Sequence, residues 1–143
     1  LSLAVEDKPD AIVDIATLTG ACVVALGQKV AGMFSTSDAL AAQIESAADD
    51  TAEAVWRMPL EPSYRKLLDS GIADMKNVGG PYGGAITAAQ FLQRFVRDGM
   101  PWCHLDIAGT ALLKAETPLA PKGATGWGVM ALNRLIRDVY EAK

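Results

Sequence analysis

Alternating apolar runs and turn-forming residues predict strands in the first third of the chain. Residues 11–16 (AIVDIA) form a short run rich in β-branched side chains, which predicts a strand buried on both faces. Residues 17–20 form the exit from that strand. The apolar run 21–26 predicts a second strand, and residues 30–34 predict a third, in which Gly32 permits close approach of another segment. These segments require a sheet.

Three later segments have the periodicity or the flanking residues of helices. Ser37 is placed to cap a helix over residues 38–48, whose apolar positions recur on one face. Residues 61–70 open with a proline and close before a glycine, which predicts a shorter helix. A third helix is expected over residues 85–97. The side chains expected to be buried are Leu40, Ala41, Ile44, Ala47 and Ala48 in the first helix, and Ile86, Ala89, Leu92 and Phe95 or Val96 in the third.

Residues 77–84 (NVGGPYGG) form a glycine-rich loop that is typical of a functional segment but lacks the lysine and serine of a phosphate-binding loop. Residues 102–108 predict a strand, and a C-terminal helix is expected to end near Tyr140. Its inward side chains are expected to be Val129, Leu132, Leu135, Ile136 and Val139. The order of strands and helices predicts an α/β fold, with a partial mixed or parallel sheet flanked by helices.

Composition narrows the class of protein. The chain has 143 residues, and 50% of them are hydrophobic, which is enough apolar material for the core of one domain. Its 17 acidic and 13 basic residues give a net charge of −4 without a basic cluster, which argues against a nucleic-acid or anionic-membrane surface. No run approaches the about 18 to 20 apolar residues that span a bilayer. Because Leu1 is neither a methionine nor part of a basic leader, we expect this chain to be part of a longer protein.

The two cysteines, Cys22 and Cys103, lie in apolar runs where a reduced thiol is expected to be buried, which favours a cytoplasmic location. Cys103 and His104 are adjacent, but neighbours along a strand point to opposite faces and cannot act as a nucleophile and its base. His104 shares a face with Asp106 and Ala108. This leaves open a hydrogen-bonded pair of histidine and aspartate, although a core histidine with satisfied nitrogens is the favoured interpretation.

Asp14 and Asp106 lie within apolar runs, where an unpaired carboxylate would be costly. A dinuclear metal site needs about four or five oxygen or nitrogen ligands, whereas this chain has one histidine and no second acidic residue next to either aspartate. We therefore expect both aspartates to have structural roles, in hydrogen bonds to loop backbone or in ion pairs with arginine or lysine. No catalytic residue and no metal ligand is predicted within the chain.

Five blocks of sequence carry a specific pattern. They are ATLTGA at 16–21, ADMKNVGG at 73–80, GGAITAAQFL at 83–92, WCHLDIAG at 102–109 and KGATG at 122–126. In this order and at these separations they resemble the carboxy-terminal part of the catalytic domain of the leucyl (cytosol) aminopeptidase family. The resemblance covers nearly the whole chain, and the stretch VDIATLTGA is by itself a strong signal.

The resemblance implies a metalloexopeptidase. Family members use two divalent metal ions, zinc or manganese, to generate a hydroxide that attacks the first peptide bond of a peptide. A lysine and an arginine, with bound bicarbonate, stabilise the transition state. The metal ligands and the arginine come from upstream segments that include an Asn-Thr-Asp-Ala-Glu-Gly-Arg motif, which this sequence lacks. We therefore expect the amino-terminal domain and the metal-binding segment to lie outside residues 1–143, and the chain alone to be inactive. The family also implies a hexamer.

The same resemblance places a substrate-side wall within the chain. It assigns substrate binding to Thr17, Leu18, Gly20, Val78, Ala108 and Ala111. Leu18 would accept a hydrogen bond from the peptide through its carbonyl, and Gly20 would donate one through its N–H. Ala108 and Ala111 would line the pocket for the first side chain, and Val78 that for the second. The pattern of elements agrees, because an open α/β sheet binds ligands at the carboxyl ends of its strands, and residues 17–20 and 108–111 follow two such ends.

The sequence also allows other functions for the same residues. A non-catalytic module could bind peptides, or assemble with an aminopeptidase subunit, through the same wall. The six wall residues could also be core residues of a sheet edge, because a family match fixes position better than role. A DNA-binding role, which some family members have, is disfavoured by the acidic balance of the chain.

Overall fold

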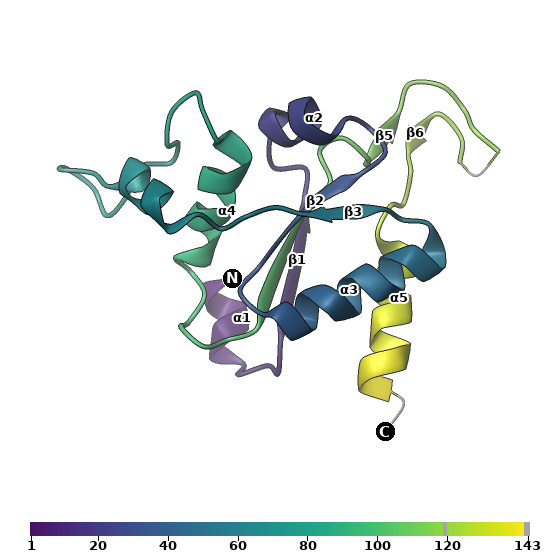
Figure 1. Cartoon of the computed structure of the whole chain (residues 1–143), viewed down its shortest axis with the longest axis horizontal. Coiled ribbons are helices and arrows are strands. Elements are labelled where there is room, and N and C mark those ends of the chain that lie inside the picture. The colour runs from purple at the N-terminus through teal and green to yellow at the C-terminus, as the bar shows by residue number, and fades with distance from the viewer. Residues whose placement is uncertain (119, 142–143) are drawn as a thin grey trace.

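The computed structural model describes residues 1–118 and 120–141, with a four-stranded sheet at its centre (Figure 1). The spatial order is β1 (Ile12–Ala16), β4 (Trp102–Asp106), β2 (Ala31–Ser35) and β3 (Val55–Arg57). β1 is parallel to β4 and β2 is parallel to β3, whereas β2 and β4 are antiparallel. A separate ribbon pairs β5 (Leu112–Leu113) with β6 (Gly123–Ala124). The predicted α/β fold with a mixed sheet is confirmed.

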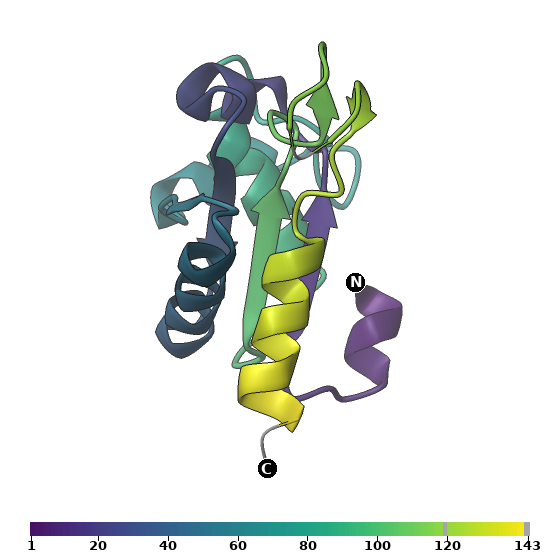
Figure 2. The same ribbon diagram turned by 90° about the vertical axis from the view of Figure 1, so that its right-hand side faces the viewer.

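Helices cover both faces of the sheet and give the protein three layers (Figure 2). One face packs against α3 (Asp38–Thr51), α5 (Val129–Leu135) and the π-helix η2 (Ile136–Glu141). The other face packs against α1 (Ser2–Glu6), α2 (Gly20–Leu26) and α4 (Gly84–Gln93). The 3-10 helix η1 (Pro62–Leu68) lies beside α4. Within residues 1–118 and 120–141, no helix is long and apolar enough to cross a membrane.

The strands differ in burial because of their places in the sheet. β4 is buried along its whole length, since it has a strand on each side and helices on both faces. Its side chains alternate between the two layers, with Cys103 and Leu105 facing α3 and Trp102 facing α1. β1 lies at an edge of the sheet, and Ile15 is 40% exposed. The prediction that residues 11–16 are buried on both faces is therefore wrong for this position.

The prediction of a strand at residues 21–26 is also wrong, because this segment forms α2. The Thr19 hydroxyl caps the helix by accepting a hydrogen bond from the Cys22 N–H at 3.0 Å, and Gly27 ends the helix with a φ of 73°. The helix lies close to β2. A Cβ at Gly32 would stand 2.8 Å from the Cys22 sulfur, so the segment that approaches this glycine closely is a side chain of α2 and not the backbone that was expected.

The predicted helices are found, but some of their ends and buried positions differ from the prediction. The Ser37 cap and all five predicted buried positions of α3 are confirmed. The segment expected as a helix at 61–70 is a 3-10 helix, and α4 ends at Gln93, which leaves Phe95 38% exposed. At the C-terminus, Val129 and Ile136 are exposed instead of inward. Val129 lies in the first turn of α5, and Ile136 begins a π-helix, whose wider turn shifts the side chains from that point around the axis.

Candidate functional site

The site begins where two parallel strands end. Ala16 and Asp106 are register partners at the carboxyl ends of β1 and β4, and the Ile107 N–H donates to the Ala16 carbonyl at 2.9 Å. Residues 17–20, the β1 exit, therefore leave the sheet beside residues 107–111, the β4 exit. Two segments almost 90 residues apart in the sequence meet at one edge of the sheet, where open α/β sheets bind ligands.

One carboxylate joins the two exits. Asp106 is 1% exposed, and its Oδ1 accepts hydrogen bonds from the N–H groups of Leu18 at 3.1 Å, Thr19 at 3.4 Å and Ala108 at 3.2 Å. Its Oδ2 accepts a hydrogen bond from the Thr19 hydroxyl at 2.7 Å. The expectation that Asp106 binds loop backbone is thus confirmed, and the carboxylate is satisfied by the two exits themselves.

An apolar pocket of about 470 Å³ opens beside the β1 exit. Its wall combines the β1 exit, the glycine-rich loop and the first turns of α4. The lining residues are Leu18, Thr19, Asn77, Val78, Gly79, Gly84, Thr87, Ala88 and Phe91. A pocket of this size and character is suited to an apolar side chain of a ligand.

The six residues assigned by resemblance are partly brought together. Leu18 and Val78 line the same pocket, with exposed fractions of 38% and 72%. Ala108 is linked to Leu18 through Asp106, while Thr17 and Gly20 are exposed on either side of Leu18. Gly20 opens α2, so its N–H is among the first-turn groups that have no acceptor within the helix. Ala111 lies farther along, in the turn before β5, where its carbonyl accepts a hydrogen bond from the Thr125 N–H at 3.0 Å.

Sequence reasoning missed the contribution of α4 to this pocket. The predicted inward stripe of this helix contains Ala89 and Leu92, whereas Thr87, Ala88 and Phe91 point to the β1 exit. A signal for them is present in the sequence, because the glycines at positions 83 and 84 allow the loop to turn directly into the helix and carry its first turns to the strand exit.

The only histidine of the sequence belongs to a buried aromatic layer. His104 is fully buried between Phe34 and Trp102, with ring centroids 6.1 and 6.4 Å away. Its Nδ1 lies 2.5 Å from Asp14 Oδ1, and the Trp102 indole N–H donates to Asp14 Oδ2 at 2.6 Å. The histidine–aspartate pair therefore involves Asp14, not Asp106. The expected satisfied histidine is only half confirmed, since Nε2 has no partner within the part of the chain that the structure describes. Among the described residues, Asp14 binds neither loop backbone nor an arginine or lysine, contrary to the prediction.

The two buried thiols have no nucleophilic character. Burial raises the pKa of Cys103 to about 12, with a smaller contribution from the negative charge of Asp14. Burial, and then the charge of Asp106, also raises the pKa of Cys22. The exclusion of a Cys103–His104 nucleophilic pair agrees with this environment, since the thiol stays protonated at neutral pH.

We expect both cysteines to resist alkylation in the folded protein. At pH 8 a thiol with a pKa of about 12 is ionised in roughly 1 molecule in 10,000, whereas an unfolded cysteine ionises substantially at that pH. Iodoacetamide labelling followed by peptide mass analysis should show reaction at Cys103 at least 100-fold slower in buffer than in denaturant. Equal rates in the two conditions would contradict this account of the thiol.

The residues in this region do not form a metal site. Among residues 1–118 and 120–141, no three His, Cys, Asp or Glu side chains are grouped so that they could hold a metal ion. Asp106 is committed to the strand exits, and Asp14 is committed to Trp102 and His104. The divalent ions implied by the family resemblance therefore do not fit the described residues.

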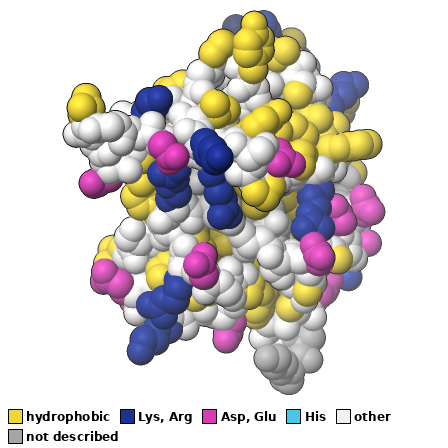
Figure 3. Space-filling model, turned by 60° about the vertical axis from the view of Figure 1, so that its left-hand side comes forward, with side chains coloured by type: hydrophobic (Ala, Val, Ile, Leu, Met, Phe, Trp, Pro, Cys, Tyr) yellow, Lys and Arg dark blue, Asp and Glu magenta, His cyan; other side chains and the backbone are white. Residues whose placement is uncertain are grey.

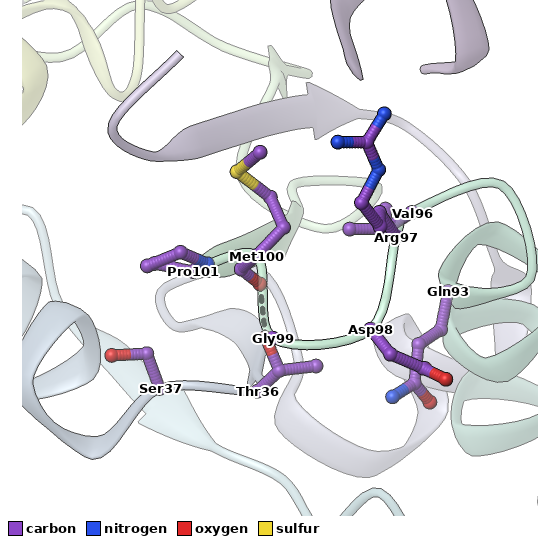
Figure 4. Close-up of a pocket in the computed structure, with 9 residues that line it drawn as sticks. All are labelled: Thr36, Ser37, Gln93, Val96, Arg97, Asp98, Gly99, Met100 and Pro101. Atoms are coloured by element: carbon purple, nitrogen blue, oxygen red, sulfur yellow. Dashed lines mark hydrogen bonds between the residues drawn. The ribbon is translucent and has the colours of Figure 1, made fainter. Parts of the chain in front are cut away.

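A second hollow, of about 330 Å³, lies at the opposite end of β4 (Figure 4). It is formed around the turn that leads into the strand, where the Thr36 hydroxyl donates to the Met100 carbonyl at 3.2 Å. The Arg97 side chain extends away from this hydrogen bond. The hollow brings together no set of groups with a chemical role, and it is far from the strand exits.

The architecture is similar to that of a leucine aminopeptidase and of a bottromycin maturation enzyme of known structure. Tomato leucine aminopeptidase matches 95% of this chain with a TM-score of 0.89 and 45% identity, over 26% of its own length. The bottromycin maturation enzyme BotP matches 95% of the chain with a TM-score of 0.90 and 39% identity, over 30% of its length. Residues 1–133 match the model of the cytosol aminopeptidase family, catalytic domain. The chain belongs to this family.

Relatives identified by sequence similarity support the same family membership. The protein named "Probable cytosol aminopeptidase" in Dinoroseobacter shibae is 60% identical over 136 residues, which are 95% of this chain and 28% of that protein. A protein of the same name in Rhodopseudomonas palustris is 54% identical over 141 residues, which are 99% of this chain and 28% of that protein. The chain thus spans little more than a quarter of the length of these relatives.

Proposed function

We propose that residues 1–143 are the carboxy-terminal part of the catalytic domain of a metal-dependent leucyl aminopeptidase, and that they supply the wall that holds the peptide substrate. The observation that carries the proposal is the meeting of the β1 and β4 exits beside an apolar pocket. Family membership gives this wall its substrate, an N-terminal segment of a peptide.

The wall residues have complementary roles in this proposal. The Leu18 carbonyl and the Gly20 N–H bind the peptide backbone, and Thr17 adds surface next to them. Ala108 and Ala111 bound the pocket for the first side chain, where the small Ala108 leaves room for a leucine-sized group. Val78 bounds the pocket for the second side chain. The support is the shared pocket of Leu18 and Val78 and the link between Leu18 and Ala108 through Asp106.

The remaining parts of the enzyme lie outside this chain in our proposal. The amino-terminal domain and the ligands of two divalent ions, manganese or zinc, belong to the part of the full-length protein that corresponds to the unmatched length of the relatives. A BotP structure in complex with manganese is among the similar structures. The name cytosol aminopeptidase supports a cytoplasmic location. Exposed apolar side chains such as Val24, Ile72 and Tyr82 support assembly into a homo-oligomer, which we propose to be a hexamer.

The full-length protein, assayed on leucine-p-nitroanilide with manganese, is expected to release p-nitroaniline and to lose this activity after treatment with a chelator. Restoration by added manganese or zinc controls for unfolding by the chelator. Hydrolysis that persists without metal, or no hydrolysis with it, would refute the proposed reaction.

The alternative is a non-catalytic module that binds peptides or an aminopeptidase subunit. The observation that favours it is that the apolar pocket lies among described residues that include no group of three His, Cys, Asp or Glu side chains able to hold a metal ion. Calorimetric titration with a leucine-containing peptide in the absence of metal tests the module. Heat of binding supports it, and the absence of heat at millimolar peptide argues against it. Hydrolysis by the full-length protein with manganese would decide for the enzyme.

A further inference from the structure

We infer that Asp106 is a positioning residue for the peptide substrate: one buried carboxylate sets the direction of the β1-exit backbone groups that face the peptide and holds the β4 exit beside them. This inference rests on the proposed function. Asp106 does not touch the peptide, because its oxygens are occupied by three backbone N–H groups and one hydroxyl of the exits. It acts through Leu18, Gly20 and Ala108.

The direction of the Leu18 carbonyl follows from peptide geometry. The Leu18 carbonyl and the Thr19 N–H belong to one peptide unit, and the chain has no cis peptide bonds among the described residues. In a trans unit these two groups point in opposite directions. Because the Thr19 N–H points to Asp106 at 3.4 Å, the Leu18 carbonyl points away from the buried carboxylate and out of the sheet edge. The neighbouring hydrogen bond from the Leu18 N–H, at 3.1 Å, fixes the unit on the other side of Leu18.

The Thr19 hydroxyl extends the same control to Gly20. It donates to Asp106 Oδ2 at 2.7 Å and accepts from the Cys22 N–H at 3.0 Å, which fixes the start of α2. Gly20 is the first residue of this helix, so the orientation of its N–H depends on the same hydroxyl. On the other exit, Asp106 holds the Ala108 N–H at 3.2 Å. A single carboxylate therefore holds the two strand exits in fixed positions relative to each other. The low exposure of the carboxylate strengthens each of these hydrogen bonds.

Four variants of the full-length protein test the inference. Thr19→Val removes the hydroxyl but keeps the shape of the side chain, whereas Thr19→Ser keeps the hydroxyl. Asp106→Asn keeps one acceptor oxygen and removes the charge. Asp98→Asn makes the same chemical change at an exposed aspartate of the turn before β4 and serves as the control.

We expect Thr19→Val and Asp106→Asn to lower kcat/KM about 100-fold, mostly through kcat, because misplaced backbone groups cost transition-state stabilisation more than ground-state binding. Asp98→Asn should stay within about 3-fold of the wild type, and Thr19→Ser should recover most of the kcat/KM that Thr19→Val loses. Thermal unfolding establishes the folded fraction of each variant, so that kcat is expressed per folded molecule. If Asp106→Asn does not fold, the comparison of kcat/KM between Thr19→Val and Thr19→Ser decides whether Asp106 positions the β1 exit through the Thr19 hydroxyl.

A second readout does not depend on activity. Hydrogen–deuterium exchange should be faster over residues 17–22 and 107–110 in Thr19→Val and in Asp106→Asn, with α3 unchanged, and Thr19→Ser should restore the wild-type pattern. Wild-type kcat/KM and wild-type exchange in a folded Thr19→Val would overturn the inference. A wild-type protein that does not hydrolyse peptides would refute the proposed function instead, and the exchange pattern would then still decide whether Asp106 orders both exits.

Discussion

Replacing Gly109 with alanine is expected to lower the midpoint of thermal unfolding of the full-length protein by about 4 °C, the largest effect that we expect of any glycine-to-alanine change in the described residues. A Cβ at position 109 would overlap the carbonyl oxygen of Gly27, at the end of α2. Both partners are backbone, so no rotamer change relieves the overlap. The β4 exit or the end of α2 must move, at a cost of about 3 to 4 kcal/mol.

Gly71→Ala is the matched control for Gly109→Ala. A Cβ at Gly71 has no neighbour within 4 Å, and its backbone is not in the left-handed region. This variant should unfold within about 1 °C of the wild type. Because the Gly109 overlap lies in the β4 exit, the destabilised variant should also lose peptidase activity below its unfolding temperature. A Gly109→Ala protein as stable as Gly71→Ala would show that the packing of α2 against the β4 exit is looser than described.

Glu53→Ala is expected to destabilise the protein by about 3 kcal/mol, because it removes the cap of a helix far away in the sequence. The N-cap residue of α5 is Gly128, which has no side chain. Glu53 replaces it by accepting hydrogen bonds from the Gly128 N–H at 2.9 Å and the Ala131 N–H at 2.8 Å. Glu53 is 6% exposed, so its removal leaves these two N–H groups buried without acceptors.

Glu45→Ala provides the comparison for Glu53→Ala, since Glu45 lies on the exposed side of α3 and alanine is a good helix former. Thermal unfolding should show a change of less than about 0.5 kcal/mol for Glu45→Ala. Glu53→Gln should be intermediate, because its amide keeps one acceptor oxygen. Equal midpoints for the two alanine variants would mean that α5 is held by its apolar face alone.

Local patterns in the sequence predict most of the fold. The Ser37 cap and the apolar periodicity after it specify α3, and the β-branched run before Thr17 specifies β1. Neither depends on distant residues. The run at 21–26 is ambiguous on its own, because short apolar segments suit both a buried strand and a buried helix. The cap at Thr19 and the stop at Gly27 decide for a helix, and both signals are present in the sequence.

Contacts between residues far apart in the sequence are less predictable, both in the core and at the candidate site. Nothing near Glu53 in the sequence indicates that it caps a helix 75 residues later. The partner of His104 is Asp14, on a neighbouring strand, and strand register cannot be obtained from either segment alone. Family resemblance assigns the six wall residues but does not indicate the carboxylate that joins two of them, Leu18 and Ala108.

Basic side chains lie on the face formed by η1 and α4 (Figure 3). The contacts of these side chains are at the surface and not in the core. They form ion pairs and hydrogen bonds with exposed partners, such as Arg94 with Asp69 at 2.8 Å and Arg65 with Gln93 at 3.2 Å. Such contacts contribute little to stability, about 0 to 1 kcal/mol each. The surface can therefore change in sequence at small cost.

Because both strand exits are anchored through main-chain groups, the position of the exits does not depend on which side chains they carry. Asp106 binds the N–H groups of Leu18, Thr19 and Ala108, which every residue except proline possesses. The side chains at positions 18 and 108 can therefore be exchanged without disturbing the anchor. An enzyme built in this way can diverge in substrate preference while its reaction geometry is inherited unchanged, and an engineer can redesign the pocket of such a scaffold one side chain at a time.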